Sequence, residues 1–275
     1  MSVLGWTPVH VPFPGLPLDR VQPPAGPHST GAVVSLAAGP GGRTLYVGRP
    51  PAIGTVVDEA WDTTAGRRTT VLAGLTSIHL AARPDGRLLI GDNRIARLPS
   101  GTVTGQGLQN EQVGALAFSS DGSRLAVGDR TGRVALWDGT VRHRTGVLRN
   151  VFPSPLGDDH PEAVSALAIS PNNSTLAVGG DTGTLQLWDI ATQQPLGGPI
   201  TIPGEGIQTL AFSRDSGTLY AGSPHVPLQH YTIATDKAVT QVCARAHGDL
   251  TRTKWNVLGP DETYRKVCSW KSRET

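Results

Sequence analysis

A repeating pattern of short apolar runs and turns constrains the fold of this chain more than any other feature. Each copy contains an apolar run with period-two alternation, a turn, a shorter apolar run that ends in glycine, a second turn and another alternating run. The pattern is clearest in residues 113–138 and 164–189 and weaker in residues 207–233, and degenerate copies occupy residues 33–62 and 78–98. Period-two alternation is typical of strands with one packed face, so each copy predicts a small antiparallel sheet.

The first turn of each copy carries residues that tolerate a positive φ, which a tight hairpin between twisted strands requires. These turns are Gly41-Gly42, Asp85-Gly86, Asp121-Gly122, Asn172-Asn173 and Asp215-Ser216. Successive first turns are separated by roughly 36 to 51 residues, which brackets the ~40–45 residues of a four-stranded propeller blade. The repeats therefore predict an all-β fold, a β-propeller of five four-stranded blades with a short helical tail at the C-terminal end.

The third runs of the two clearest copies end in Trp137-Asp138 and Trp188-Asp189, with Asp-Gly turns upstream. In these residues the chain resembles the blades of WD-repeat propellers, and the resemblance covers residues 28 to about 235. It implies that both Trp-Asp pairs, together with Trp61, are structural residues.

The chain also departs from the WD-repeat pattern. His28 and His160 stand at the histidine position of two blades, whereas the family's second-strand serine is replaced by apolar residues and its turn aspartate is shifted. The replaced serines correspond to Val127, Val178 and Ala221, and the shifted aspartates are Asp129 and Asp181. We expect apolar packing to hold these blades in place of the family's buried polar network.

Three regions are expected: residues 1–27 as an N-terminal segment, residues 28–235 as the blades, and residues 236–275 as a helical tail packed on the propeller. The extended segment at about residues 6–13 is predicted to pair with the third strand of the fifth blade and close the ring, because that blade lacks an outer strand. Two alternatives are an open ring completed by another chain and a sixth blade in residues 14–30.

The tail predicts one or two helices. Asp236 is a good N-cap, and apolar residues follow it at helical spacing. We expect the tail to bury Val239, Val242, Trp255 and Leu258 against the propeller. Cys243 and Cys268 are the only two cysteines, and they either form a disulfide or remain as two buried thiols. Residues 236–266 are similar to the C-terminal ending of actinobacterial WD-repeat signalling proteins.

Composition indicates which kinds of partner to expect. The net charge is only +2 and charged residues make up 17% of the chain, which does not favour nucleic-acid binding. No signal-like start and no long apolar stretch are present, so we expect a cytoplasmic protein and no membrane span. An excess of arginine over lysine indicates a bacterial, high-GC coding sequence.

One group of charged residues recurs in register. Glu111, Glu162 and Glu205 each lie two residues before an inner strand, which predicts that they share one rim of the propeller at the channel mouth. The insert before the fourth copy adds Asp158, Asp159 and His160. Turns facing the same side carry Arg49, Arg94, Arg130 and His225. This rim is suited to gripping a peptide or a protein loop, although such residues are also ordinary solvated loop residues of WD repeats.

No catalytic motif, metal-ligand spacing or cofactor motif is recognisable in the sequence. We therefore assign no catalytic residue, metal or cofactor and expect a non-catalytic interaction, sensor or scaffold propeller whose partner is another protein or peptide. Because the tail resembles that of signalling proteins, we expect the propeller to act together with a separately encoded effector protein. The alternative is an enzyme or a small-ligand or metal-binding protein that uses His28, His160 and the rim acids at the channel mouth. The basic cluster Arg142, His143, Arg144 and Arg149 is interpreted as a solvated outer loop.

Overall fold

The computed structural model describes residues 33–48, 58–75, 77–92, 94–104, 108, 111–152, 161–201, 205–226, 228–246, 251–258, 263–264 and 268. The predicted closing strand at residues 6–13 lies outside the described residues. The same is true of the alternative blade at residues 14–30, of His28 and Arg49, and of Asp158, Asp159 and His160.

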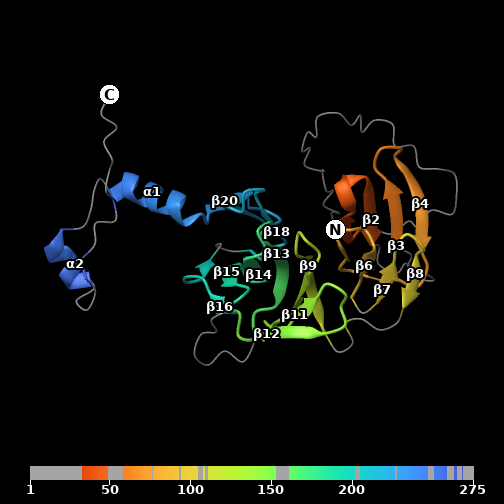
Figure 1. Cartoon of the computed structure of the whole chain (residues 1–275), viewed down its shortest axis with the longest axis horizontal. Helices are drawn as coiled ribbons and strands as arrows, with labels where there is room; N and C mark the ends of the chain where they lie inside the picture. Colours follow the sequence, from red (N-terminus) through yellow and green to blue (C-terminus); the bar gives the residue numbers. More distant parts are fainter. Residues whose placement is uncertain are drawn as a thin grey trace, which may run out of the picture.

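The five sequence copies form five antiparallel sheets in chain order, which confirms the all-β propeller fold (Figure 1). The first blade contains β1 (Ser35–Ala38), β2 (Thr44–Gly48), β3 (Asp58–Asp62) and β4 (Arg67–Leu72), with a short 3-10 turn at Pro40–Gly42. The second contains β5 (Ala81–Ala82), β6 (Leu88–Ile90), β7 (Ile95–Arg97) and β8 (Thr102–Thr104). The third contains β9 (Val113–Phe118), β10 (Arg124–Asp129), β11 (Val134–Asp138) and β12 (Arg144–Leu148).

The last two blades have less regular outer edges. The fourth contains β13 (Val164–Ile169), β14 (Thr175–Gly180), β15 (Thr184–Asp189), β16 (Gln194–Pro195) and β17 (Ile200–Thr201). The short strands β16 and β17 both pair with β15, so two short segments together form the outer strand of this blade. The fifth contains β18 (Thr209–Phe212), β19 (Thr218–Gly222) and β20 (Gln229–Thr232). This sheet has three strands among the residues described, one fewer than a complete blade.

The predicted first turns adopt the required backbone conformation. Positive φ angles occur at Gly41 (64°), Gly86 (70°), Gly122 (68°), Asn173 (59°) and Ser216 (58°). Glycine has no Cβ to clash in this region, and asparagine tolerates it better than most residues. The turn signals in the sequence therefore located the hairpins correctly.

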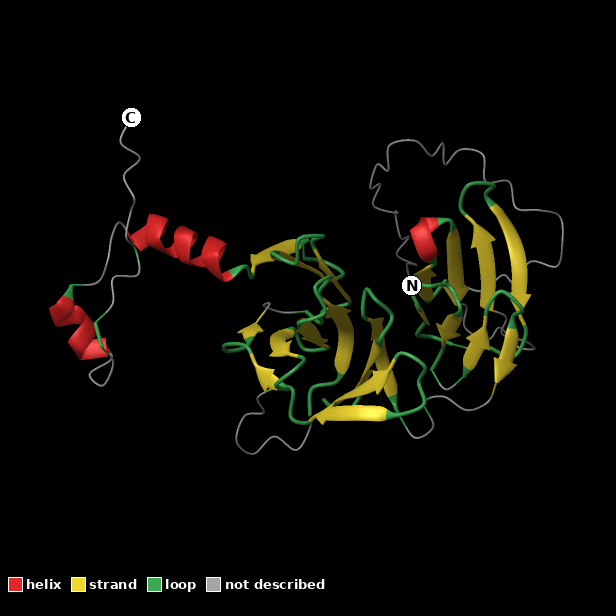
Figure 2. Ribbon diagram, in the orientation of Figure 1, coloured by secondary structure: helices red, strands yellow, loops and turns green. Residues whose placement is uncertain are grey.

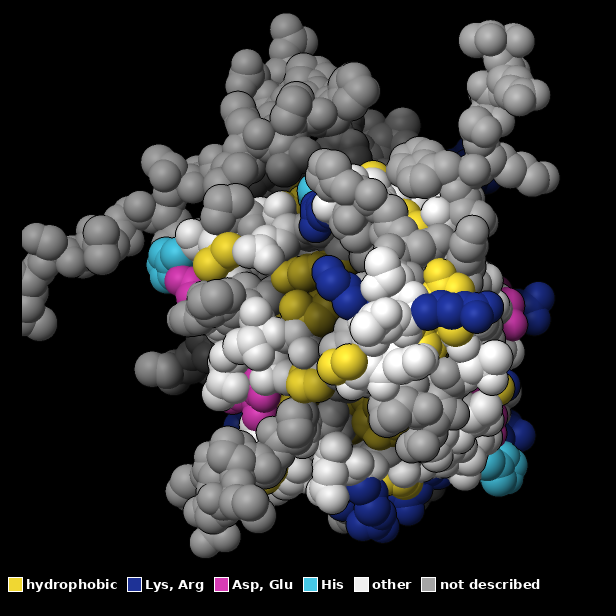
Figure 3. Space-filling model, turned by 90° about the vertical axis from the view of Figure 1, so that its left-hand side faces the viewer, with side chains coloured by type: hydrophobic (Ala, Val, Ile, Leu, Met, Phe, Trp, Pro, Cys, Tyr) yellow, Lys and Arg dark blue, Asp and Glu magenta, His cyan; other side chains and the backbone are white. Residues whose placement is uncertain are grey.

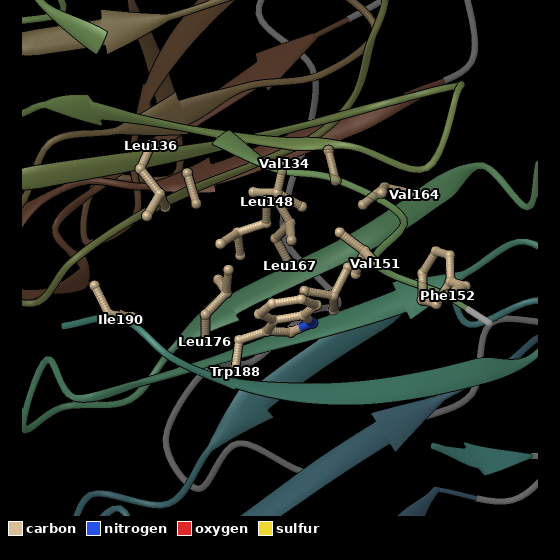
Figure 4. Close-up of a cluster of buried hydrophobic side chains, with 13 residues drawn as sticks. Val134, Leu136, Leu148, Val151, Phe152, Val164, Leu167, Leu176, Trp188 and Ile190 are labelled. Atoms are coloured by element: carbon tan, nitrogen blue, oxygen red, sulfur yellow. The ribbon is translucent and has the colours of Figure 1, made fainter. Parts of the chain in front are cut away.

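The core consists of apolar layers between consecutive blades. One cluster joins the first blade to the second, and three more join the second, third, fourth and fifth blades in order. Figure 4 shows the layer between the third and fourth blades, where Leu136 and Leu148 face Leu167, Leu176 and Trp188. Each inner sheet buries its two faces against the sheets before and after it, so the core lies between blades and not within one of them.

A glycine near the end of the second strand makes room for the next blade. A Cβ added at Gly128 would overlap the side chain of Val164, the first residue of β13. A Cβ at Gly179 would lie 2.7 Å from the Cγ2 atom of Ile207 in the fifth blade. The recurring glycine is thus a requirement of close packing between blades.

Two helices follow the propeller, α1 (Thr235–Ala246) and α2 (Arg252–Leu258) (Figure 2). In Figure 1, α1 leads away from β20, and α2 lies beyond its far end. Val239 was expected to be buried but is 36% exposed, because α1 extends away from the sheets. The structure joins Cys243 and Cys268 in a disulfide, with their Cα atoms 5.3 Å apart.

The tail also has contacts of its own. The Trp255 ring packs edge-on against the ring of Tyr264, with the ring centroids 5.8 Å apart. The Arg252 guanidinium lies over the Tyr264 ring, 5.3 Å from its centroid. At its base, α1 is tied to the fifth blade by Lys237, whose Nζ atom lies 3.0 Å from the Oδ2 atom of Asp215.

Candidate functional site

The loops at the end of the blades where the inner strands begin form the rim. Among the described residues the rim comprises 91–92, 94, 111–112, 129–133, 161–163, 181–183, 205–206 and 223–226. In the second to fifth blades, each inner-strand start lies beside the turn that joins the second and third strands of the same blade. The rim residues predicted from the sequence that the structure describes are Glu111, Glu162, Glu205, Arg94, Arg130 and His225. Their contacts are as follows.

Glu162 and Glu205 bind the turns of their own blades. The Oε1 atom of Glu162 accepts hydrogen bonds from the backbone N–H groups of Thr182 (3.1 Å) and Thr184 (3.0 Å). Glu205 accepts one from the backbone N–H of His225 (2.9 Å), and its other oxygen lies 2.6 Å from His225 Nδ1. The bond from the His225 backbone lowers the pKa of Glu205 most. The two glutamates thus fix the shape of the rim, and Glu205 and His225 are two of the predicted rim residues that lie in contact.

Glu111 occupies a different position from the other two glutamates. Its side chain is 10% exposed, and its Oε1 atom lies 3.3 Å from Arg144 Nη1, on the outer strand of the same blade. In the first blade, Glu59 on β3 performs this role for Arg68, at 2.7 Å. The third blade has Ala135 where the first has Glu59, so Glu111 reaches in from the preceding loop to pair with the arginine.

Aspartates after the second strands complete the rim. Asp92 accepts the backbone N–H groups of Ile78 (2.9 Å) and His79 (3.2 Å), and this arrangement leaves β5 shorter than the predicted run 78–82. Asp181 accepts the N–H of Ala163 at 3.0 Å. These bonds join the inner-strand start of a blade to its own second turn.

Asp129 is the most enclosed of these aspartates, with a side chain 3% exposed. Its Oδ1 atom accepts the backbone N–H groups of Thr131 (2.8 Å) and Arg133 (2.9 Å). Its other oxygen accepts Nε of Arg133 at 2.8 Å. Burial alone would raise the pKa of Asp129, but hydrogen bonds from Arg133 and Thr131 outweigh it and hold the pKa below its usual value.

Exposed basic side chains stand on this fixed backbone. Arg94 and Arg130 are exposed, and the His225 side chain is 83% exposed. The backbone beneath them is held in place, because the Arg130 N–H donates to the carbonyl of Gln112 (3.2 Å) and the Arg94 carbonyl accepts from Gly91 (2.9 Å). On the face shown in Figure 3, Lys and Arg side chains occur in separate groups with hydrophobic side chains between them.

No group of three or more metal-ligating side chains occurs in the part of the chain that the structure describes. No helix within that part is long and apolar enough to cross a membrane.

A group of arginines at the opposite end of the blades was not recognised from the sequence. Arg83, Arg87 and Arg97 line a cavity there together with Arg142. Only Arg142 had been noticed, as part of a run of basic residues.

Two of the sequence repeats match a known family model. The family model described as "WD domain, G-beta repeat" matches residues 99–138 and 153–189, which include the first three strands of the third and fourth blades. The chain contains two segments that match the WD repeat. The matched segments end on the two Trp-Asp pairs from which the resemblance was inferred.

Several known proteins are similar in sequence to this chain over more than half of its length. It is 29% identical over 184 residues to "Guanine nucleotide-binding protein subunit beta" of Nicotiana tabacum, covering 59% of this chain and 47% of the relative. It is 25% identical over 270 residues to "Cell division cycle 20.1, cofactor of APC complex" of Arabidopsis thaliana, covering 86% and 57%. It is 30% identical over 175 residues to "WD repeat-containing protein slp1" of Schizosaccharomyces pombe, covering 62% and 33%. The chain therefore spans between a third and somewhat over half of the length of these eukaryotic relatives.

Proposed function

We propose that this WD-repeat chain is a non-catalytic protein-interaction platform that binds a protein or peptide partner with its rim. One observation carries the proposal: in each of the second to fifth blades, hydrogen bonds fix the rim loops before any partner binds. Asp92, Asp129, Asp181 with Glu162, and Glu205 supply these bonds. A surface that is already ordered loses little conformational entropy on association, which favours affinity.

The names of the relatives support a partner-binding role. One is a subunit of a guanine nucleotide-binding protein and another is a cofactor of a complex, so both names describe proteins that work in assemblies. For this chain we further propose a separately encoded effector, a bacterial origin and a cytoplasmic location, on the basis of the tail resemblance and the composition. The proposal involves neither nucleic acid nor a membrane.

Site-specific photo-crosslinking tests the rim as the binding surface. A photo-reactive residue is placed at His225 or at Arg130, each on the rim, and at Arg214 as a matched control. Arg214 is also exposed but lies in the first turn of the fifth blade, at the opposite end. We expect the same protein to be captured from both rim positions and not from Arg214.

Two results would contradict the proposal. The first is equal capture of the same proteins from all three positions, which would indicate non-specific contact. The second is absence of rim crosslinks in a protein that retains stoichiometric metal or turns over a small molecule. That second result would favour the enzyme or ligand-binding alternative at the channel mouth.

A further inference from the structure

An arginine-lined cavity lies at the base of the array, the end of the blades opposite the rim. Its volume is about 610 Å³, and residues in and beside hairpin turns of the second and third blades line it. Arg83, Arg87 and Arg97 line it from the second blade, and Arg142 lines it from the third. We call these four residues and the cavity that they line the arginine pocket.

The second blade holds three of the arginines in register. Arg83 follows β5, Arg87 precedes β6 and Arg97 ends β7. The Arg83 N–H donates to the carbonyl of Leu88, and the Arg87 carbonyl accepts from the N–H of Leu98, both at 2.9 Å. These backbone bonds continue the sheet ladder, so the three side chains project from a rigid base.

The third blade positions the fourth arginine through its Trp-Asp pair. Asp138 accepts hydrogen bonds from the backbone N–H groups of Thr140 (2.8 Å) and Arg142 (3.2 Å). Neighbouring basic residues of the run that contains Arg142 therefore have different contacts in the structure. His143 Nδ1 lies 3.0 Å from Asp138, Arg144 pairs with Glu111, and Arg142 lines the pocket.

The arginine pocket carries excess positive charge. Asp85 is the carboxylate nearest to two of the arginines, 3.6 Å from Arg83 Nε and 4.0 Å from Arg87 Nε. Within the described part of the chain, Arg97 and Arg142 have no carboxylate at ion-pair distance. Guanidinium groups gathered around one cavity repel each other, and an anion placed between them would convert that repulsion into attraction.

The remaining wall indicates the kind of anion. Leu88, Leu98 and Pro99 supply apolar surface, and Ser100 and Thr140 supply hydroxyl groups. A phosphoryl group carries close to two negative charges and three acceptor oxygens, which suit several forked guanidinium donors. Among the described residues that line the cavity none is aromatic, so they do not offer the stacking platform that single-stranded nucleic acids use.

We propose that the arginine pocket binds a phosphoserine- or phosphothreonine-containing peptide. The phosphate would lie between arginines of two blades, and the apolar wall would contact the residues flanking the phosphorylated side chain. Clusters of arginine are a recurrent way to recognise phosphorylated motifs. Because this pocket and the rim lie at opposite ends of the blades, failure of one proposal leaves the other standing.

Fluorescence polarisation with labelled degenerate peptides tests the proposal on the full chain. One library of nine-residue peptides has phosphothreonine fixed at the centre, and a second has threonine there. We expect the phosphorylated library to bind at least about ten-fold more tightly, as charge-assisted hydrogen bonds predict. Arg97→Ala combined with Arg142→Ala should remove that preference, and Arg142→Lys should reduce it, because lysine keeps the charge but not the forked donors.

Controls separate a real site from general charge effects. Arg214→Ala removes an exposed arginine at the same end of the array and should leave binding unchanged. Melting curves of each variant establish that the blades still fold. Equal binding of both libraries, or a preference that survives the double substitution, would overturn the proposal. So would tighter binding of inorganic phosphate, single-stranded DNA or anionic vesicles than of the phosphopeptides.

Discussion

At the scale of single residues, the aspartate of each Trp-Asp pair organises a turn. Asp138 accepts hydrogen bonds from the N–H (2.8 Å) and hydroxyl (2.6 Å) groups of Thr140 and from the N–H of His143 (2.8 Å). These bonds outweigh partial burial and hold the pKa of Asp138 well below its usual range. The tryptophans act differently, since the indole nitrogens of Trp137 and Trp188 are buried with no hydrogen-bond partner among the described residues. Both rings therefore stabilise the blades mainly by apolar packing.

Replacing Asp138 by alanine should destabilise the chain by about 1.5–3 kcal/mol, the range for hydrogen bonds to charged groups. The matched change Asp189→Ala should cost less. Asp189 accepts the N–H and hydroxyl groups of Thr192, with a smaller contribution from the Ala191 N–H, whereas Asp138 also accepts the N–H groups of Arg142 and His143. The midpoint of urea unfolding measures both effects. An equal shift for the two variants would show that the extra bonds of Asp138 add nothing.

Asp129 makes the stability depend on pH. Its pKa is lowered in the folded chain, so its contribution is fully present above the unfolded pKa of about 3.9 and is lost as the pH falls through the folded value. Asp129→Asn removes this titration. We expect the melting temperature of the variant to lie below that of the unaltered chain at pH 6, with the difference shrinking below about pH 4. A constant difference across this range would contradict the assignment.

At the scale of elements, the tail is a small unit held by its own cross-link. The ion pair between Lys237 and Asp215 is largely exposed on both sides, and such pairs contribute little to stability. Helices as short as α1 and α2 are marginal in water without packing. The disulfide between Cys243 and Cys268, together with the contact of Trp255 on Tyr264, therefore supplies most of the support visible in the described residues.

Removing the cross-link with Cys243→Ser and Cys268→Ser should release the tail and leave the blades folded. Closing a loop of this length stabilises by about 3.5 kcal/mol in the chain-entropy model. Hydrogen exchange should therefore accelerate in α1 and α2 but not in strands such as β14, which is buried among other strands. Unchanged exchange in both helices would contradict this view. A parallel loss of protection in the blades would show that the tail docks on them.

At the scale of the whole molecule, the terminal blades expose faces that the inner blades bury. Tyr46 and Tyr220 occupy the same place in matching Thr-Leu-Tyr-x-Gly strands, yet Tyr46 is 5% exposed and Tyr220 is 38% exposed. Leu36 in β1 is 57% exposed, whereas its counterpart Leu167 in β13 is 9% exposed. Tyr46 has the second blade against it, and Tyr220 has no following blade in the described structure.

This matched pair tests whether the array closes in solution. In an open array, Tyr46→Ala should cost about 3 kcal/mol or more, as for other large buried side chains, and Tyr220→Ala well under half of that. Similar costs at both positions would show that something covers the last blade. Measurement of both variants with and without residues 1–13 then tests the predicted closing strand, which lies outside the described residues.

Closure by residues 6–13 stays a prediction, and light scattering separates it from its alternative. If that segment closes the ring, the full chain should be a stable monomer, and deleting residues 1–13 should promote association through the exposed edge. An open ring completed by another chain should already associate before any deletion. A deletion that changes neither the melting temperature nor the mass would rule out a closing role.

Local features of this protein could be derived from the sequence because they depend on neighbouring residues. The positive φ of Gly86 or Asn173, the alternating strands and the Trp-Asp pairs are all set within a few residues. Glu162 and Glu205 share the same spacing before their inner strands, and in the structure each contacts the turn between the second and third strands of its own blade. Even there, the sequence did not show that backbone N–H groups of the facing turns occupy both carboxylates.

The remaining features were decided by packing between segments far apart in the chain. The Glu111 side chain pairs with Arg144 of the outer strand, in the blade where Ala135 stands at the position of Glu59 in the first blade, and no local pattern records that exchange. The arginine pocket likewise exists only where turns of two successive blades meet, which brings Arg83 and Arg142 to one cavity. Side-chain periodicity specifies which face of a strand is buried, but the partner of that face is chosen when the blades stack. Contacts between blades are therefore a property of the tertiary structure alone.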